Sequence, residues 1–404
     1  MYLKVPVHDL EIGMFVVNIG LSRDDDPNLY SVEGLITSEA EIRAIKADGY
    51  QEVIIDTDRT IVRLHASVGQ SEDSSHAFPT IETAAACGMS GQNQTSLSNE
   101  LPKAEKALGE MLRFVREFTR DIRLGKQIDV IASGVIVEGV VDSVSRNSQA
   151  MLGLCKLRSF DEYTYTHSLN VSVLAVVYGK CLGLPREQLR ELGLAGMFHD
   201  VGKTAVPEQI LNKPGKLTHD EFEIMKTHPA KGRAMLYRIG DLSREILDGV
   251  LHHHERHNGK GYPNGLTANQ LALFPRIIGM VDVYDALTSR RCYKLGMIPN
   301  KALSLMFGLR GEDFEAGHLD RFIKCLGIYP LGSFVRLDNG LRGFVVETVD
   351  NSPLRPKVKL FFDNAMRKIT PEELDLSDYT TPAIIECLDP TMFDINPADY
   401  VFTT

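Results

Sequence analysis

Residues 196–203 read Gly-Met-Phe-His-Asp-Val-Gly-Lys and close a segment with helical apolar spacing. They place His199 beside Asp200 at the predicted end of that helix, and Lys203 follows one turn later. An imidazole next to a carboxylate is a pair that metal ions use, and a lysine at this spacing suits a phosphate group. Because neighbouring His and Asp residues are common on protein surfaces, the pair becomes informative only if other segments supply further ligands.

Such further ligands are concentrated in one part of the chain, since eight of the 12 histidines fall between His167 and His257. Asp282 lies in an apolar helical segment, where a carboxylate is costly to bury unless it is paired or metal-bound. Asp285 follows three residues later on the same helical face. The remaining candidates are His167, His228 and the run His252-His253-His254-Glu255.

Mixed imidazole and carboxylate ligands suit first-row transition metals such as Fe, Mn, Ni or Zn. Two metals that share one carboxylate need about seven to eight ligands, and the segment supplies that many. Paired metals of this kind are a familiar arrangement for phosphoester hydrolysis, because they lower the pKa of a shared water and hold the phosphate oxygens. The cysteines are scattered without a Cys-x-x-Cys, which excludes an all-thiolate zinc site.

The composition is that of an ordinary globular protein, with 404 residues, 43% hydrophobic residues and a net charge of −10. The negative charge argues against broad binding to a nucleic acid polymer or an anionic membrane. There is no apolar signal core and no window long enough to span a bilayer, so we expect a cytoplasmic location. The six cysteines are expected to be reduced thiols.

Four segments follow from the pattern of residues. Residues 1–65 predict a small α/β module with regulatory or docking function, with strands at 2–7, 14–17 and 53–55 and a helix at 39–48. Residues 66–102 are polar, small and aperiodic, which predicts a flexible linker. Residues 103–330 predict a helical catalytic domain, and residues 331–404 predict a β-hairpin subdomain with a loosely packed tail.

Apolar spacing predicts the helices of the third segment. The first begins at Lys103 and carries an apolar stripe from Leu108 to Ile122, for which core packing is favoured over pairing in a homodimer. The others are expected at residues 135–144, 169–182, 187–198, 219–235, 246–254, 268–287 and 301–309. After them, residues 333–337 and 342–349 flank Asp338-Asn339-Gly340, which predicts a hairpin, and residues 357–362 add a third strand. The predicted class is therefore mainly α.

The central segment resembles an HD-GYP domain, a subgroup of the HD phosphohydrolases. Three motifs carry the resemblance, and they match in order over residues 127–330. They are His199-Asp200-Val-Gly-Lys203, His253-His254-Glu255-Arg-His-Asn-Gly259-Lys-Gly261-Tyr262-Pro263, and Asp282-Val-Tyr-Asp285-Ala-Leu-Thr288-Ser-Arg-Arg291-Cys-Tyr293-Lys294. The N-terminal module and the C-terminal hairpin also resemble those fused to a bacterial subset of the family.

The resemblance implies an HD-type helical bundle with a di-metal site, often occupied by iron, that hydrolyses cyclic di-GMP to pGpG or on to GMP through a metal-activated hydroxide. It implies that His167, His199, Asp200 and Asp282 hold one metal, and that Asp200 bridges to a second metal held by His228, His253 and His254. Lys203 would steady the phosphate, Arg291 and Lys294 would bind the phosphate or a guanine, and Tyr262 would line the site. Asp285 is a candidate proton-handling or supporting group.

Three departures from the family pattern bear on these expectations. Tyr163 stands where some members have a glutamate linked to a third metal, so two metals are expected. Asn258 replaces an aspartate and Cys292 replaces a proline, and neither change removes a ligand. His252 and His257 are expected to lie beside the ligands without binding metal.

Two alternatives remain open at this point. The first is a phosphodiesterase for 3′,3′-cyclic GMP-AMP, since the residue pattern does not distinguish two purine dinucleotides that have the same phosphate ring. The second is a module with little activity that binds cyclic di-GMP or another protein, and its expected partner would be a signalling protein.

Overall fold

The computed structural model describes residues 2–16, 34–36, 38–39, 42–43, 45, 52–56, 60, 94–126, 128–157, 163–213, 215, 217–289, 296–349, 352 and 354–401. The chain divides into two compact units. The first unit consists of residues 1–86 with 208–225, and the second consists of residues 87–207 with 226–404.

The first unit contains a small antiparallel sheet around a compact apolar core. Its strands β1 (Tyr2–Pro6), β2 (Phe15–Val16), β3 (Gly34–Leu35) and β4 (Glu52–Asp56) lie in the order β1-β4-β2-β3. The short helix η1 (Val7–Asp9) follows β1, and α6 (Glu208–Leu211) and α7 (His219–Met225) belong to the same unit. The three predicted strands are confirmed. The predicted helix at 39–48 is helical at residues 39, 42, 43 and 45, and its other positions lie outside the described residues.

The second unit begins with two long helices, α2 (Leu97–Arg123) and α3 (Val130–Leu157). Helix α2 starts six residues before the predicted Lys103, so the expected linker does not extend to residue 102. Ser96 caps the helix by accepting a hydrogen bond from the Asn99 amide. Glu100 is fully buried and accepts hydrogen bonds from Ser143 and Arg146 of α3. Glu100, which falls in the predicted linker, is therefore buried because α3 supplies its hydrogen-bond partners.

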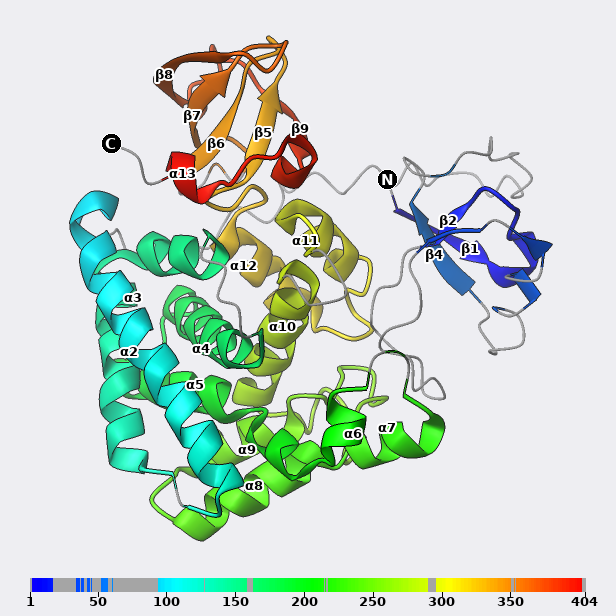
Figure 1. The fold of residues 1–404 in the computed structure, drawn as a ribbon, viewed down its shortest axis with the longest axis vertical. Helices are drawn as coiled ribbons and strands as arrows, with labels where there is room; N and C mark the ends of the chain where they lie inside the picture. The colour runs from blue at the N-terminus through cyan, green and yellow to red at the C-terminus, as the bar shows by residue number, and fades with distance from the viewer. Residues whose placement is uncertain are drawn as a thin grey trace. The chain divides into compact units, whose positions relative to one another are not determined.

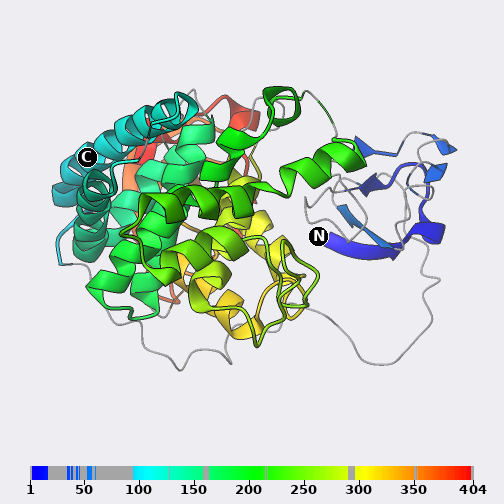
Figure 2. The ribbon, with the colours of Figure 1, turned by 90° about the horizontal axis from the view of Figure 1, so that it is seen from below.

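Helix α4 (Tyr163–Cys181) lies at the centre of the second unit because it is apolar around its whole circumference. Helix α5 (Arg186–Phe198) packs beside it, with α2 and α3 on one side and α10 (Leu273–Thr288) on the other (Figures 1 and 2). The predicted apolar stripe of α2 is buried against this bundle, as core packing requires. The remaining helices are η3 (Val201–Ala205), α8 (His228–Ile239), α9 (Arg244–His252), α11 (Pro299–Phe307) and α12 (Ala316–Leu326).

Two predicted helices, at 219–235 and 135–144, have the wrong bounds, and one helix was not predicted. The single helix expected at 219–235 is two helices, α7 and α8, because α8 begins anew at His228 with Pro229 in its first turn. The prediction missed α12, which packs against α4 and α11. The valine-rich segment at 135–144 is the middle of the longer α3, which bends at Asn147.

The predicted hairpin and third strand are confirmed, but the expected loose tail is wrong, because two further strands complete a five-stranded antiparallel sheet. The strands β5 (Phe334–Leu337), β6 (Arg342–Glu347), β7 (Lys357–Phe362), β8 (Lys368–Asp375) and β9 (Ile384–Leu388) lie in the order β8-β7-β6-β5-β9. Strand β8 is polar and contains Pro371, which an edge strand tolerates. Helices η4 (Pro390–Phe393) and α13 (Ala398–Val401) follow, and Tyr400 stacks on Phe344.

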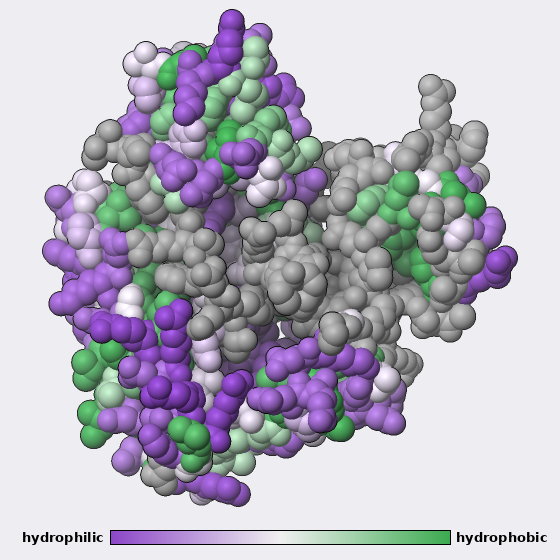
Figure 3. Space-filling view, in the orientation of Figure 1, coloured by the Kyte–Doolittle hydropathy of each residue, from purple (hydrophilic) through white to green (hydrophobic). Residues whose placement is uncertain are grey.

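A disulfide joins Cys181 at the end of α4 to Cys325 in α12, so the expectation of reduced thiols is wrong for this pair. The two cysteines are 144 residues apart in sequence, and only the packing of α12 on α4 brings them together. In the part of the chain that the structure describes, no helix is both long and apolar enough to cross a bilayer. Figure 3 shows a largely hydrophilic face, with scattered hydrophobic residues over the helical part.

Candidate metal centre

The predicted metal ligands come from five helices or helix ends of the second unit. His167 lies in the first turns of α4, and Asp282 lies in the middle of α10. The pair His199-Asp200 follows the end of α5, His228 opens α8, and His253 and His254 follow α9. Residues from distant parts of the sequence therefore meet where these helices converge.

Two glycines allow this convergence. A Cβ atom on Gly202 would overlap the carbonyl oxygen of His228, so η3 can lie against the start of α8 only with glycine at this position. A Cβ atom on Gly279 of α10 would lie 2.5 Å from the carbonyl oxygen of His253. The backbones that carry the ligands are thus in direct contact, which is why the ligands are close to one another.

The first ligand group consists of His167, His199 and Asp282, whose ligand atoms lie within 4.8 Å of one another. Nε2 of His167 is 3.1 Å from Oδ1 of Asp282, and Nε2 of His199 is 3.9 Å from the same oxygen. All three side chains are buried. We call this set the first ligand group.

The second ligand group consists of Asp200, His228, His253 and His254, again within 4.8 Å of one another. Nε2 of His228 is 3.3 Å from Nε2 of His253 and 3.2 Å from Oδ1 of Asp200. Two imidazole nitrogens at this separation either share one proton or direct lone pairs toward a common cation.

Asp200 connects the two groups through its two oxygens. Its Oδ2 atom is 3.3 Å from Nε2 of His199 and 3.6 Å from Nε2 of His167. Its Oδ1 atom is the one that faces His228 and His253. Lys203 donates to Oδ2 at 2.6 Å. A single carboxylate therefore presents one oxygen to each group.

Hydrogen bonds from Nδ1 orient the rings of three ligands. Nδ1 of His199 donates to the Gly196 carbonyl and Nδ1 of His253 donates to the Val250 carbonyl, both at 2.8 Å. In a neutral imidazole this leaves Nε2 with a free lone pair that points into the cluster. Nδ1 of His167 donates to Oδ2 of Asp285 at 2.7 Å.

Two buried atoms of the cluster lack a hydrogen-bond partner within the described residues: Nε2 of His199 and Oδ1 of Asp200. Unpartnered buried lone pairs are costly, and a cation in each ligand group would satisfy them. The donor chemistry of the cluster, imidazole nitrogen with carboxylate oxygen, fits a first-row transition metal. The residues could therefore hold metal ions.

The pKa of His167 in the first group is shifted in the opposite direction to those of His253 and His254 in the second group. Burial opposes the charge of His167, but hydrogen bonds to Asp282 and Asp285 outweigh burial and raise its pKa to about 10. Burial and the neighbouring imidazoles hold the pKa of His253 and of His254 well below the usual range. Without a metal, His167 is protonated at neutral pH, whereas the other two are neutral and ready to act as ligands.

The carboxylates of the cluster stay ionised despite their burial. Burial alone would raise the pKa of Asp200, but His199 and Lys203 hold it well below its usual range. Asp282 behaves in the same way, because the hydrogen bond and charge of His167 outweigh burial and lower its pKa. Both carboxylates are thus available as anionic ligands at neutral pH.

Asp285 lies behind His167 and its two oxygens are both engaged. Oδ2 accepts from His167, and Oδ1 accepts from Asn170 and from Ser289, each at 2.8 Å. A carboxylate that holds the far nitrogen of a metal-binding imidazole fixes the ring and raises its basicity. This geometry favours the supporting role for Asp285 over proton handling.

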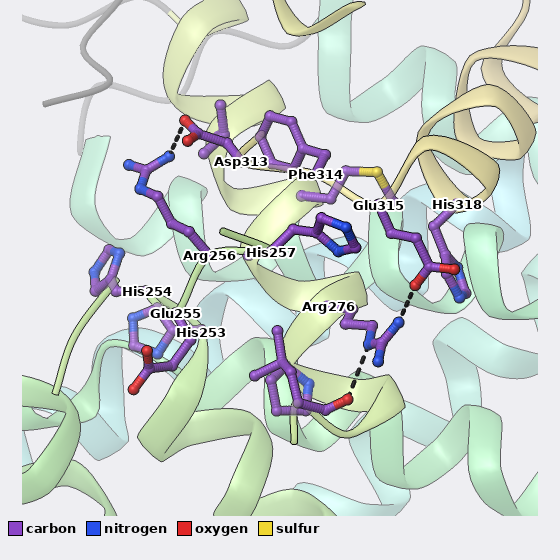
Figure 4. Close-up of a pocket in the computed structure, with 15 residues that line it drawn as sticks. His253, His254, Glu255, Arg256, His257, Arg276, Asp313, Phe314, Glu315 and His318 are labelled. Carbon is purple, nitrogen blue, oxygen red and sulfur yellow. Dashed lines mark hydrogen bonds and ion pairs between the residues drawn. The ribbon is translucent and has the colours of Figure 1, made fainter. Parts of the chain in front are cut away.

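The loop after α9 contacts the second ligand group through Tyr262. Its ring stacks on the imidazole of His254, with centroids 4.7 Å apart and planes at 29°. Glu255 holds the loop by accepting hydrogen bonds from the amides of Asn264 and Leu266. The segment from His253 to His257 lines a cavity of about 40 Å³. Figure 4 shows Arg256 of this segment paired with Asp313, which also lines the cavity.

The described residues do not cover every predicted site residue. Arg291, Cys292 and Lys294 lie outside them, as does the side chain of Tyr163. His252 and His257 belong to neither ligand group. Sequence reasoning missed the supporting roles of Asn170 and Ser289. Ser289 stands four residues after Asp285, a helical spacing that could have suggested the contact.

Family models match three parts of the chain. A model described as an HD domain matches residues 144–316, a KOW domain associated with HD domain matches residues 334–395, and a domain of unknown function (DUF3391) matches residues 2–132. These correspond to the helical bundle that carries the ligands, to the C-terminal sheet, and to the N-terminal unit extended through α2.

Two relatives of known activity are similar to the chain. A cyclic di-GMP phosphodiesterase of Pseudomonas aeruginosa is 36% identical over 375 residues, which covers 93% of this chain and 88% of the relative. A 3′3′-cGAMP-specific phosphodiesterase of Vibrio cholerae is 37% identical over 173 residues, which covers 43% of this chain and 39% of the relative. Among solved structures, an HDGYP-type protein of Bdellovibrio bacteriovorus aligns over 80% of this chain and 98% of its own, with 18% identity and a TM-score of 0.46.

The helical fold and the clustered histidine and aspartate ligands define an HD-domain phosphohydrolase. The similarity to the Pseudomonas enzyme extends over nearly the whole of both chains, and the three sequence motifs all fall in the helical bundle. The chain therefore belongs to the HD-GYP family, with the KOW-type domain at its C-terminal end.

Proposed function

We propose that the chain hydrolyses cyclic di-GMP, with pGpG or GMP as the product, and with two transition-metal ions in its two ligand groups. The observation that carries the two-metal proposal is Asp200, whose two oxygens face different groups at 3.3 and 3.2 Å from His199 and His228. The long match to a cyclic di-GMP phosphodiesterase supports the substrate.

The first ligand group with Asp200 would hold one ion, and the second group would hold the other. Imidazole and carboxylate ligands suit Fe, Mn, Ni and Zn alike. Iron is our first choice because the resemblance to the HD-GYP family implies a site often occupied by iron. When bound, such a pair supplies a water of lowered pKa and positive charge toward the phosphate.

The remaining chemistry falls to side chains around the ligands. Lys203 has three donor hydrogens, so it can keep its hydrogen bond to Asp200 and still donate to a phosphate oxygen. Asp285 would orient His167 without touching the substrate. Tyr262 would line the site, and Arg291 and Lys294 are proposed from the sequence motif to bind the phosphate or a guanine.

The test is to purify the chain without oxygen, load it with Fe or Mn, and measure both metal per chain and cyclic di-GMP turnover by chromatography. Asp200→Asn keeps the shape of the side chain and removes its charge, so we expect metal content and turnover to fall together. Asp248→Asn is the matched control, since Asp248 lies on α9 outside both ligand groups. Loaded wild type that binds cyclic di-GMP without turnover would favour the messenger-binding alternative.

A second candidate substrate is 3′,3′-cyclic GMP-AMP, which the similarity to the Vibrio enzyme supports. Both cyclic dinucleotides offer the same phosphate ring to the ligand groups, so discrimination must come from contacts to the bases. Turnover of an equimolar mixture decides between them. We expect cyclic di-GMP to disappear first, and preferential loss of the hybrid would reverse the assignment.

A further inference from the structure

The ligands of the cluster differ in what holds their rings. His199 and His253 are fixed by hydrogen bonds to backbone carbonyls, and His167 is fixed by Asp285. For His254, no hydrogen bond from either ring nitrogen occurs among the described residues. Its neighbours are instead rings, of which Tyr262 is the most nearly parallel, at 29°.

Tyr262 is itself held firmly against His254. Its backbone amide donates to the His254 carbonyl at 3.3 Å. A Cβ atom on the preceding Gly261 would lie 2.5 Å from the same carbonyl oxygen, so the loop can approach this closely only with glycine there. The ring contact is therefore built into the path of the loop.

Glu255 and Asp313 fix the loop on either side of this contact. The carboxylate of Glu255 is buried and accepts from the amides of Asn264 at 2.6 Å and Leu266 at 2.8 Å. Asp313 pairs with Arg256, and its carbonyl accepts from the amide of His257 at 3.0 Å. Figure 4 shows Arg256 reaching toward Asp313 while His254 and Glu255 lie on the other side of the segment.

We propose that Tyr262 is a positioning residue for His254, and that it thereby controls how tightly the second ligand group retains its metal. A stacked ring limits rotation of the imidazole less strictly than a hydrogen bond in line with a ring nitrogen. The second group is consequently the one whose ion depends on Tyr262. This inference rests on the proposed two-metal site, and its test uses metal content instead of turnover.

The experiment measures metal per chain by mass spectrometry after equilibration in metal buffers of graded free Mn²⁺ concentration, without oxygen. For wild type we expect two ions that are released at different concentrations. Tyr262→Ala should weaken retention of the ion in the second group by about tenfold, the lower end of the range for loss of a ligand's supporting partner, and leave the other ion unchanged. Tyr262→Phe keeps the stacked ring and should behave as wild type.

Two further variants make the result specific. Tyr237→Ala is the matched control, because Tyr237 is 69% exposed on α8, outside both ligand groups. His254→Ala should remove the same ion, and adding Tyr262→Ala to it should cause no further loss. Circular dichroism melting of each metal-free variant detects a variant that fails to fold. If Tyr262→Ala does not fold, Tyr262→Phe provides the test, because it should retain both ions as tightly as wild type.

The outcomes separate this inference from the proposed function. Equal weakening of both ions in Tyr262→Ala, or none, overturns the inference even if the chain hydrolyses cyclic di-GMP. Fewer than two ions in wild type at saturating Mn²⁺ also overturns it. Two ions with the expected pattern, in a chain that hydrolyses no cyclic dinucleotide, uphold the inference and overturn the function.

Discussion

The two ligand groups are built from the same residue types but supported in different ways. The first group rests on α10, where Asp285 holds His167 and is itself held by Asn170 and Ser289. The second group depends in part on a loop, through the ring of Tyr262. A chain of hydrogen bonds inside a helix bundle fixes a ligand more strictly than a ring contact from a loop. Support, rather than ligand identity, therefore distinguishes the two groups.

The largest effect should come from the residue that the groups share. Asp200→Asn removes the charge that faces both groups, so we expect loss of both ions and turnover below about 1% of wild type, since loss of a supporting partner alone costs about 10- to 100-fold. Metal analysis and chromatographic assays of the loaded variant check this. Retention of one ion at full occupancy would show that Asp200 is not shared.

Asp285→Asn should weaken metal binding in the first ligand group alone. The amide supports His167 less well than the carboxylate, so the first group should bind its ion about 10- to 100-fold more weakly while the second group is unaffected. Titration of metal-free protein with Mn²⁺ measures both affinities. A uniform weakening of both groups would contradict independent supports.

The pH dependence of metal affinity should differ between the two ligand groups. Metal binding to the first group must displace the proton of His167, whose pKa is raised to about 10, so its affinity should rise about tenfold per pH unit below that value. His253 and His254, whose pKa values are lowered, are already neutral at pH 7, so the second group should gain little. Mn²⁺ titrations at neutral and mildly alkaline pH without oxygen compare the slopes, and two equal slopes would be evidence against the assignment.

The smallest effect is expected for a support remote from both groups. Gln149 on α3 donates to Oγ1 of Thr348 at 2.5 Å and accepts from the Thr348 amide at 3.2 Å, which ties the helices to the C-terminal sheet. Gln149→Ala should cost about 1–2 kcal/mol of unfolding free energy. Thermal melting should show a shift of a few degrees, with metal affinities as in wild type. Altered metal retention would mean that the sheet also supports the ligands.

Much of the helical fold could be predicted from the sequence because it depends on local apolar spacing, and the proposed ligand set follows from the resemblance of three long motifs to the HD-GYP family. Apolar spacing located α5 and α10 to within a few residues, and the motif around His253 and His254 was long enough to be specific. What failed depended on tertiary contacts. Glu100 looked like a solvated linker residue until α3 supplied its partners, and strand β8 is polar because it lies at an edge.

The residues that hold the ligands in position were even harder to predict from the sequence than the strands. Asn170 lies 115 residues from Asp285, and no local pattern relates the two. Tyr262 was predicted to line the site, and its stacking on His254 depends on the folded path of the loop. The missing disulfide prediction has the same origin, since only packing brings Cys181 to Cys325.

The close approach of Gly202 to the His228 carbonyl and of Gly279 to the His253 carbonyl has a consequence for sorting relatives of this chain into active and inactive enzymes. A side chain at either glycine would push a ligand-bearing backbone outward, although every histidine and aspartate ligand would still be present in the sequence. A survey that counts only ligands would thus score such a sequence as an intact enzyme. Checking these two positions as well would identify relatives whose centre is complete in composition but cannot assemble.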